Sequence, residues 1–547
     1  MSQVPGDGLE SWKEIAAYLS RGVRTVRRWE REEGLPVHRH VHQKLGSVYA
    51  SKSEIDAWRR TRGSGADRTP VSAVALAAAA AAAKSIAVLP FTNLSADAAN
   101  QYFADGLTDE VTADLSKIRS LRVISRTSSM TFRGSTKDVK TIAGELGVRY
   151  LLDGSVRRAG DRLRITARLI DASTDDHVWA DTYDGTVDDV FAMQQRLATV
   201  IVEALQLRLT AEEQRRLAER PIDNLHAYEC YLRARHEGWR WRKDAIDRAI
   251  RLLGDGLEMV GDNVRLHTAL GLAHLQYREA GIDLSDLPLV EADACARRVF
   301  ALDPASASGL QLRGWIQYSR GHVQEAVRDL KAALALDPNN ADSLLLLSNC
   351  YLISGRVPLA RPLVARLLSV DPLTPLSRCL PGFADLLEGH FAAAVEPYRQ
   401  MFEMDPANPM ARLFYVCVLL LNHRNEEVDG LVRTCPPEIQ NSVPAQIALF
   451  LAHASAGERR EAQAVVTAEI EAVATATDVF PRLLAQGYAM AGVPERAIHW
   501  LAIAVERGFI NYPFLARHDP FFETLRSDPQ FQRVLQDVRN RWERFEW

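Results

Sequence analysis

The sequence predicts a multidomain, mainly α protein: a small winged helix-turn-helix, then a small α/β domain, then an α-solenoid of helical hairpins. Three observations lead to this fold class. The chain of 547 residues is longer than one hydrophobic core can serve. Its middle alternates strand-like and helix-like segments, and its second half repeats with a period of 34 residues.

We expect the parts at residues 1–62 for the winged unit, 63–84 for a linker, 85–210 for the α/β domain and 222–547 for the solenoid with a C-terminal cap. The basic charge lies at the N-terminal end. Residues 1–62 carry 12 Lys and Arg against 8 Asp and Glu, which is +4, while the whole chain carries −4, which leaves −8 for the rest. The first segment is therefore the one to inspect for contacts with nucleic acid.

Two short helices are expected in this segment. Ser11 precedes an amphipathic pattern from Trp12 to Leu19, and Glu14 completes a capping box. After the turn at residues 21–22, a second helix from about Val23 to Glu33 ends at residues 34–36, Gly-Leu-Pro. A helix, a tight turn and a second helix follow one another.

The exposed face of the second helix carries arginines at positions i, i+3, i+4 and i+7. Like charges at this spacing repel one another, so an anionic partner is a natural explanation. Guanidinium groups suit phosphates and guanine edges in a major groove, whereas the alternative is a solvated basic face. The row consists of Arg24, Arg27, Arg28 and Arg31, with Thr25 beside it.

Residues 37–42 and 47–50 form two short strand patterns joined by a basic turn, followed by a short helix from Ser53 to Trp58. Through SWKEIAAYLSRGVRTVRRWEREEGLPVHRH and VYASKSEIDAW, the segment resembles winged helix-turn-helix modules of the MerR and excisionase type. The resemblance implies base or phosphate contacts for Arg24, Thr25, Arg27 and Arg28, and phosphate contacts for Arg39 and Lys44. Histidines at 38, 40 and 42 share one strand face, as metal ligands could, but wing residues explain them better.

The middle of the chain predicts a strand at 85–91, a helix at 101–116, a strand at 121–125 and a helix at 139–146. Strands follow at 150–157, 163–171 and 177–183, and a helix from about Val187 to Leu209 closes the domain. We attribute Asp105, Asp109 and Glu110 to stabilisation of a helix start. Residues 126–129, Arg-Thr-Ser-Ser, fit either a capped loop or a small polar pocket.

Through SIAVLPFTNLS, YFADGLTDEVTADLSK and LRVISRTSSMTFRG, residues 85–185 resemble the small α/β domain of TolB and FlgO-like proteins. Chains of this kind are sometimes called adenylate cyclases. The segment lacks a glycine-rich phosphate loop and a pair of aspartates placed to bind metal. We therefore predict no catalytic residue, no metal site and no cofactor, and no enzymatic activity.

The second half contains a countable repeat. Asp-Pro pairs begin at 303, 337, 371 and 405, and three glycines share the spacing of 34. This pattern is that of tetratricopeptide repeats, in which glycine permits the turn between two helices, alanine allows their close packing, and Asp-Pro ends the second helix. The positions that define the repeat are Gly321, Ala326, Pro338, Gly355, Ala360, Pro372, Gly389, Ala394, Pro406 and Gly457. About seven or eight units are expected, with a terminal capping helix pair at 519–535.

Together these features predict a cytoplasmic, DNA-binding transcriptional regulator whose repeat array holds a protein or peptide in its concave groove. A homodimer on a two-fold DNA site fits this prediction. No membrane contact is expected, because the alanine-rich run at 71–83 is too short to span a bilayer. The alternative is a scaffold that does not bind DNA and assembles a signalling or envelope complex.

Overall fold

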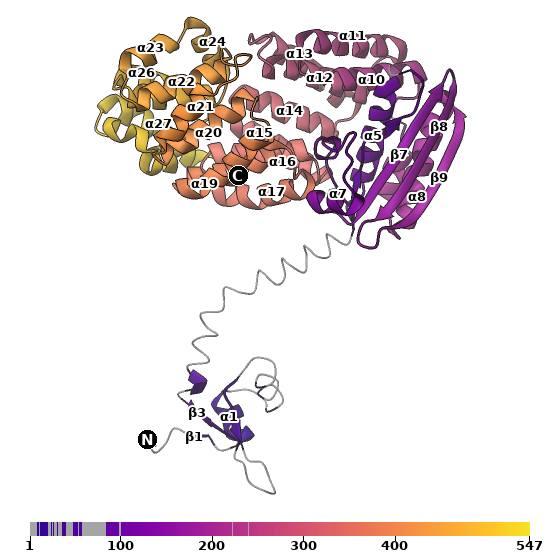
Figure 1. The fold of residues 1–547 in the computed structure, drawn as a ribbon, viewed down its shortest axis with the longest axis horizontal. Helices are drawn as coiled ribbons and strands as arrows, with labels where there is room; N and C mark the ends of the chain where they lie inside the picture. Colours follow the sequence, from indigo (N-terminus) through magenta and orange to yellow (C-terminus); the bar gives the residue numbers. More distant parts are fainter. Residues whose placement is uncertain are drawn as a thin grey trace. The chain divides into compact units, whose positions relative to one another are not determined.

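The computed structural model describes residues 8–9, 11–19, 23, 26, 30, 35–39, 48–52, 54–56, 84–97, 100–220, 222–238 and 240–546. The chain divides into two compact units, Met1–Ala81 and Ala82–Trp547 (Figure 1). The second unit holds both the α/β domain and the helical array. No helix among the described residues is long and apolar enough to cross a membrane.

Among the described residues of the first unit are a short helix and a three-stranded antiparallel sheet, and Val23, Val26 and Glu30, within the predicted second helix, are also helical. Ser11 accepts a hydrogen bond from the backbone N–H of Glu14 and caps the helix, as expected. The edge strand pairs His38 with Tyr49, which is the strand pair predicted for the wing. The elements are β1 (Gly8–Leu9), α1 (Trp12–Tyr18), β2 (His38–Arg39) and β3 (Val48–Ser51), in the sheet order β1-β3-β2.

The α/β domain is built on a mixed sheet in the order β6-β4-β7-β8-β9, with β5 also paired to β7. The strands β4, β5 and β6 run parallel to their neighbours, whereas β7, β8 and β9 form an antiparallel meander. The bounds are β4 (Ser85–Val88), β5 (Thr92–Asn93), β6 (Arg122–Val123), β7 (Tyr150–Ala159), β8 (Arg162–Asp171) and β9 (Asp176–Thr186).

Helices cover this sheet because its strands carry apolar side chains toward them. One apolar cluster joins the sheet to α5 (Gln101–Ser116) and α8 (Val190–Ala204), and a second joins it to α7 (Val139–Leu146). The long helix predicted from Val187 to Leu209 is instead a 3-10 turn (Val187–Asp189), α8 and a separate α9 (Ala211–Ala218). The segment after β6, for which a loop was one prediction, is the short helix α6 (Arg126–Met130).

The array comprises eight helical hairpins among the described residues. In Figure 1 they run from the α/β domain as a curved stack coloured from magenta to yellow. The first helix of each hairpin is α10 (Leu225–Gly238), α12 (Val264–Glu279), α14 (Ala307–Ser319), α16 (Ala341–Ile353), α18 (Pro375–Leu387), α20 (Pro409–Leu421), α22 (Val443–Ser455) or α25 (Phe480–Met490). The second helices are α11 (Lys243–Val260), α13 (Leu287–Leu302), α15 (Val323–Leu336), α17 (Val357–Val370), α19 (Phe391–Met404), α21 (Asn425–Arg433), α23 (Arg459–Val465) with α24 (Ala468–Ala476), and α26 (Pro494–Glu506).

The turns inside the hairpins explain the spacing of the glycines. Gly321, Gly355, Gly389 and Gly457 all have φ between 69° and 81°, a left-handed conformation that glycine adopts without strain. His423 stands where the period would place another glycine, and its φ is 56°. Small side chains at 326, 360, 394 and 462 are fully buried between the paired helices. Asp-Pro follows the second helix in successive hairpins.

The C-terminal segment differs from the expected helix pair. It consists of a π-helical turn (Phe514–His518), a 3-10 helix (Pro520–Leu525) and the long helix α27 (Pro529–Arg544). Phe522, Phe531 and Val538 are fully buried in the same apolar cluster as the repeats. The segment is therefore part of the array's core.

Candidate functional site at the junction of the α/β domain and the array

Most of the predicted DNA contacts lie outside the described residues, namely Arg24, Thr25, Arg27, Arg28, Arg31 and Lys44. Arg39 lies on the edge strand β2, where it pairs with Val48. Two side-chain contacts hold the described part of the winged unit together. The Tyr18 hydroxyl donates to Asp56 at 2.7 Å, and the His38 ring lies 2.8 Å from the Glu54 carboxylate.

The α/β domain and the array meet where α5 packs against α10. Gly106 on α5 faces Leu232 on α10, and a Cβ at Gly106 would lie only 2.7 Å from a Leu232 methyl carbon. The side chain of Leu232 therefore fills the space that glycine leaves. Buried residues of α5, α10 and α12 belong to one apolar cluster with the sheet. The first two hairpins thus share a core with the α/β domain.

A buried ion pair crosses this junction. The guanidinium of Arg265 on α12 donates to the carboxylate of Glu110 on α5, and their side chains are 22% and 9% exposed. Burial lowers the pKa of Arg265, but the anionic groups around it, first of all Glu110, raise it above its usual value. Arg265 also lies over the ring of Tyr231, 5.7 Å from its centroid. Helix α5 is thereby tied to the second hairpin as well as the first.

A second set of charges lies nearer the start of α5. Asp105 binds Arg133 at 2.6 Å and the His236 ring at 2.9 Å, while Asp109 binds Arg126. Burial raises the pKa of the Asp105 carboxyl, but hydrogen bonds from His236, Arg133 and Gln101 outweigh burial and hold the pKa at about 2. The Asp105 carboxylate is therefore ionised, and it contacts side chains from both domains. Our attribution of Asp105, Asp109 and Glu110 to a helix start misses these contacts, since all three lie inside α5.

Arg126 completes this charged group. Burial first, and then the nearby guanidinium of Arg235, lower the pKa of Arg126 to about 9. Arg235 on α10 lies 3.9 Å from Asp109, so the carboxylate of Asp109 faces a guanidinium from each domain. At neutral pH Arg126 therefore remains charged. The group links α5, α6 and α10 by charge.

The α/β domain also contacts the fourth hairpin of the array. Ser128 on α6 donates to the Asp371 carboxylate at 2.7 Å, and Ser125 donates to the same oxygen. The backbone N–H of Ser125 donates to the carbonyl of Val370 at 2.6 Å. The polar side chains that follow β6 are thus contacts to the Asp-Pro turn between α17 and α18, which neither the loop nor the pocket interpretation predicts.

These contacts bring together two sequence motifs that we considered separately. The acids of α5 and the Arg-Thr-Ser-Ser segment face one another and the array, and their charges are paired or hydrogen-bonded. The arrangement fixes one domain on the other, which is a mechanical rather than a chemical role. The acids at i, i+4 and i+5 of α5 were the sequence signal that could have indicated a face that meets cations.

The array's own later segments contact its earlier hairpins. Arg278 on α12 donates to the carbonyl of Ala476 at 3.0 Å, and Tyr318 on α14 donates to Asp478. Asn511 donates to the carbonyl of Leu352 at 3.0 Å, and Ile510 donates its backbone N–H to the carbonyl of Ile353 at 3.1 Å. The four earlier residues lie in the last turn of the first helix of their hairpin, so segments about 160 to 200 positions later pack against these helix ends.

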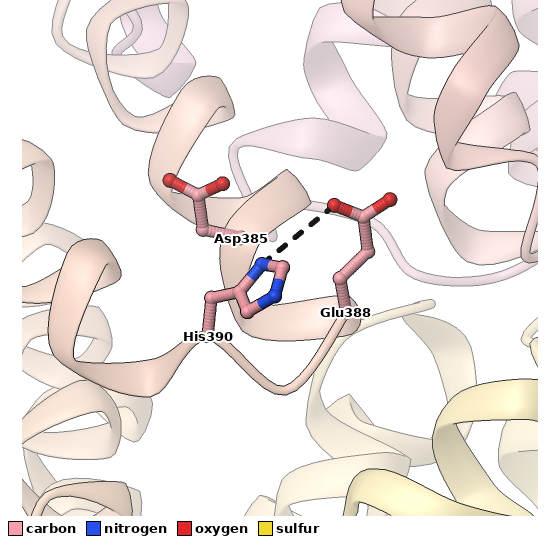
Figure 2. Close-up of side chains that lie close together, drawn as sticks. All are labelled: Asp385, Glu388 and His390. Carbon is pink, nitrogen blue, oxygen red and sulfur yellow. Dashed lines mark ion pairs between the residues drawn. The ribbon is translucent and has the colours of Figure 1, made fainter. Parts of the chain in front are cut away.

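One group of side chains has the elements of a metal site. Asp385, Glu388 and His390 gather at the turn after α18, where Figure 2 shows the His390 ring directed at Glu388, 3.9 Å away. Arg361 already binds both carboxylates, and its distance to Asp385 is 2.8 Å. A divalent cation would have to displace this guanidinium. All six cysteines are free thiols and lie apart from this group.

Two family matches cover parts of the chain. Residues 82–200 match the second domain of HilA/YgeH-like transcriptional regulators. Residues 317–377 match the tetratricopeptide repeat, which confirms the repeat predicted from the 34-residue period. Tetratricopeptide proteins generally bind protein partners. The α/β domain is thus of a regulator type.

One curated relative shares a segment of this chain. It is named putative adenylate cyclase 3, from Rhizobium meliloti (strain 1021), and is 42% identical over 191 residues. The match covers 35% of this chain and 32% of the relative, so the chain spans about a third of the relative's length.

Solved structures with some likeness to the chain are repeat proteins. A tetratricopeptide protein of Thermus thermophilus is 18% identical, with 36% of this chain and 99% of that chain covered and a TM-score of 0.29. One from Parabacteroides merdae ATCC 43184 is 13% identical, with 51% and 99% covered and a TM-score of 0.33. The pilF protein of Pseudomonas aeruginosa is 16% identical, with 40% of this chain and 96% of that chain covered and a TM-score of 0.31. PilW, a type IV pilus biogenesis factor, is 15% identical, with 40% and 94% covered and a TM-score of 0.31.

Proposed function

We propose that this protein is a cytoplasmic, non-enzymatic transcriptional regulator that binds DNA through residues 1–62 and a protein or peptide through its repeats. The observation that carries the proposal is the match of residues 82–200 to the second domain of a transcriptional regulator family. In this chain a small basic unit precedes that domain, at the place where a DNA-binding domain would stand. The proposed DNA-binding unit, the α/β domain and the partner-binding repeats thus follow one another along the chain.

The N-terminal unit supports DNA binding in two ways. Its described residues form a helix and a sheet whose outer strand pair, β2 with β3, suits a wing. Its sequence resembles MerR and excisionase modules, and the row formed by Arg24, Arg27 and Arg28 supplies cations for phosphates and base edges. The resemblance of residues 85–185 to TolB and FlgO-like domains adds no chemistry to this proposal.

Selection of genomic fragments by the full-length chain, followed by fluorescence anisotropy on the selected site, tests DNA binding. The variant combines Arg24→Gln, Arg27→Gln and Arg28→Gln. This variant should bind the DNA site at least a hundredfold more weakly. The slope of log K against log salt concentration should be smaller in magnitude by about 0.9 for each phosphate that the variant no longer neutralises. Affinity and salt dependence unchanged by these substitutions would remove the proposal.

A matched control makes the same change of three charges elsewhere. Arg399, Arg539 and Arg541 are half-exposed and pair with carboxylates of their own helices. Their combined substitution by glutamine should leave DNA affinity within about twofold, because each of these charges is already paired with a carboxylate of its own helix. An equal loss of DNA affinity in this control would show that the effect of the Arg24, Arg27 and Arg28 substitutions comes from net charge alone.

The repeats are proposed to bind their partner on surfaces that the array's own segments leave open. Capture of a protein by the full-length chain, with DNA binding intact, fits a regulator that receives a signal. A chain that retains its partner but does not bind DNA favours the scaffold alternative. Sedimentation velocity with and without the selected DNA tests the homodimer, which should place two chains on a two-fold site.

The name of the Rhizobium meliloti relative raises cyclase activity as a second candidate. We propose that the chain lacks this activity, since its segment 85–185 contains no phosphate loop and the acids of α5 are paired with cations. Purified chain incubated with ATP and Mg²⁺ or Mn²⁺ should produce no cyclic AMP above a blank. Steady production of cyclic AMP would overturn the non-enzymatic part of the proposal.

A further inference from the structure

An open hollow lies at the edge of the junction, where the α/β domain meets α10. Its volume is about 710 Å³, within the range of sites that hold small molecules, roughly 300–1,000 Å³. Residues 94, 96, 97 and 100 line one side of it, the turn between β7 and β8 lines a second, and Arg233 on α10 lines a third. The lining includes Leu94, Tyr102, Arg158 and Arg233.

The hollow has an excess of positive charge. Three arginines and one aspartate line it: Arg157, Arg158, Arg233 and Asp97. Glu229, just beyond the lining, binds Arg158. Even with both carboxylates counted, the hollow keeps one positive charge more than it has negative charges. An anion would balance this charge.

Arg233 is one of the two lining arginines, with Arg157, for which no ion pair is formed among the described residues. Its guanidinium lies against the Tyr102 ring, 4.7 Å from the centroid, and its one hydrogen bond to a described residue is a long one of 3.3 Å to the Tyr102 hydroxyl. Among the described residues, no carboxylate lies within 4.0 Å of its nitrogens. A guanidinium that is held by an aromatic face and has open donors is suited to bind a phosphate or carboxylate with two parallel hydrogen bonds.

Arg158 forms more hydrogen bonds than Arg233 and lines the same hollow. Its Nη1 donates to Tyr102 at 3.1 Å and to Glu229, and its Nε donates to the carbonyl of Gly160 at 3.2 Å. The Ser95 hydroxyl accepts a hydrogen bond from the backbone of Arg158 at 2.9 Å, which ties the two rims together. The walls of the hollow are thus held in place in the absence of an occupant.

The opposite side of the hollow is apolar. Leu94 is 48% exposed, one of the largest exposures among the chain's large apolar side chains, and Ala159 and Gly160 continue this side. An apolar side chain at the rim of a charged hollow favours a ligand with both an anionic and an apolar part.

We propose that this hollow binds a small organic anion, whose phosphate or carboxylate group contacts Arg233 and whose apolar part lies against Leu94. Arg233 and Glu229 belong to α10, whereas Tyr102 and Arg158 belong to the α/β domain, so the occupant contacts both sides of the junction. The site stands on its own geometry and does not depend on DNA binding.

Isothermal titration calorimetry on the full-length chain at low salt tests the proposal with four probes: AMP, glucose 6-phosphate, citrate and inorganic phosphate. At least one organic probe should bind saturably, and at least tenfold more tightly than inorganic phosphate. Arg233→Gln should weaken this binding tenfold or more, and Arg233→Lys should weaken it less, because the charge stays but the fork is lost. Arg251→Gln, an exposed change of equal charge outside the hollow, should have no effect.

Hydrogen exchange gives a readout that is independent of the heat of binding. The bound probe should slow exchange in residues 100–106 and 225–238, and Arg233→Gln should abolish this protection while leaving exchange elsewhere unchanged. No saturable binding of any organic probe, inorganic phosphate binding as tightly as the organic probes, or an equal loss with Arg251→Gln would each overturn the proposal.

Discussion

The ion pair between Glu110 and Arg265 provides the sharpest test of the junction. In Glu110→Gln the side chain keeps its size, but Arg265 loses its main counter-charge in a site where it is 22% exposed. Removing one partner of a buried pair costs about 3–5 kcal/mol. Since Arg265 keeps some contact with water and Asp114 lies near it, we expect a loss at the lower end of this range, about 3 kcal/mol.

Hydrogen exchange of α5, α10 and α12 measures this loss locally, which is needed because a chain with several parts does not unfold in one step. The double variant Glu110→Gln with Arg265→Gln removes both charges. The stability lost in this double variant should be about 2 kcal/mol less than the sum of the losses in the two single variants. Glu212→Gln, which breaks an exposed pair with Arg215 and Arg216, is the control and should cost no more than about 0.5 kcal/mol.

Two results would refute the reasoning. If Glu110→Gln is as mild as Glu212→Gln, the pair contributes no more than a surface contact. If the single effects simply add in the double variant, the two side chains are not coupled, and the α/β domain is held on the array by apolar contacts alone.

Two further predictions concern the array. Burial raises the pKa of the Asp519 carboxyl from 3.8 to about 6, so its contribution to stability is present below pH 4 and is lost as the pH rises through 6. Relative to Asp519→Asn, the free energy of urea unfolding of the wild type should fall by up to about 3 kcal/mol between pH 4 and 7. A pH-independent difference between the two would contradict this. Gly389→Ala should destabilise the array by about 1–2 kcal/mol more than Gly457→Ala. Both glycines have a left-handed φ, but of the two only Gly389 would place a Cβ 2.6 Å from the His518 ring. Equal midpoints of urea unfolding for the two variants would show that this contact relaxes freely.

Much of the architecture could be predicted because it rests on local rules. The bounds of α5 and α7 follow from helical periodicity, and the Asp138 side chain caps α7 as a helix start requires. The turn between β7 and β8 follows from a Gly-Asp pair between two alternating strands. The helix predicted to end at Leu209 ends at Ala204, since no strong stop signal marks its last turn.

The candidate site was harder to predict because its members are far apart in sequence. Ser128 and Asp371 are separated by 243 positions, and Glu110 and Arg265 by 155. No spacing rule connects such residues. The acids of α5 were the one local signal, and the sequence alone led us to attribute them to a helix start.

The amino-acid order alone determined the 34-residue repeat, because the turn inside a hairpin favours glycine, the packing of its two helices favours a small residue, and both positions lie within one unit. The course of the array was decided only in three dimensions. Ala476 reaches Arg278 and Asn511 reaches Leu352 across 198 and 159 positions of the chain. No local pattern connects residues so far apart, so these contacts within the array and the junction with the α/β domain belong to the tertiary structure.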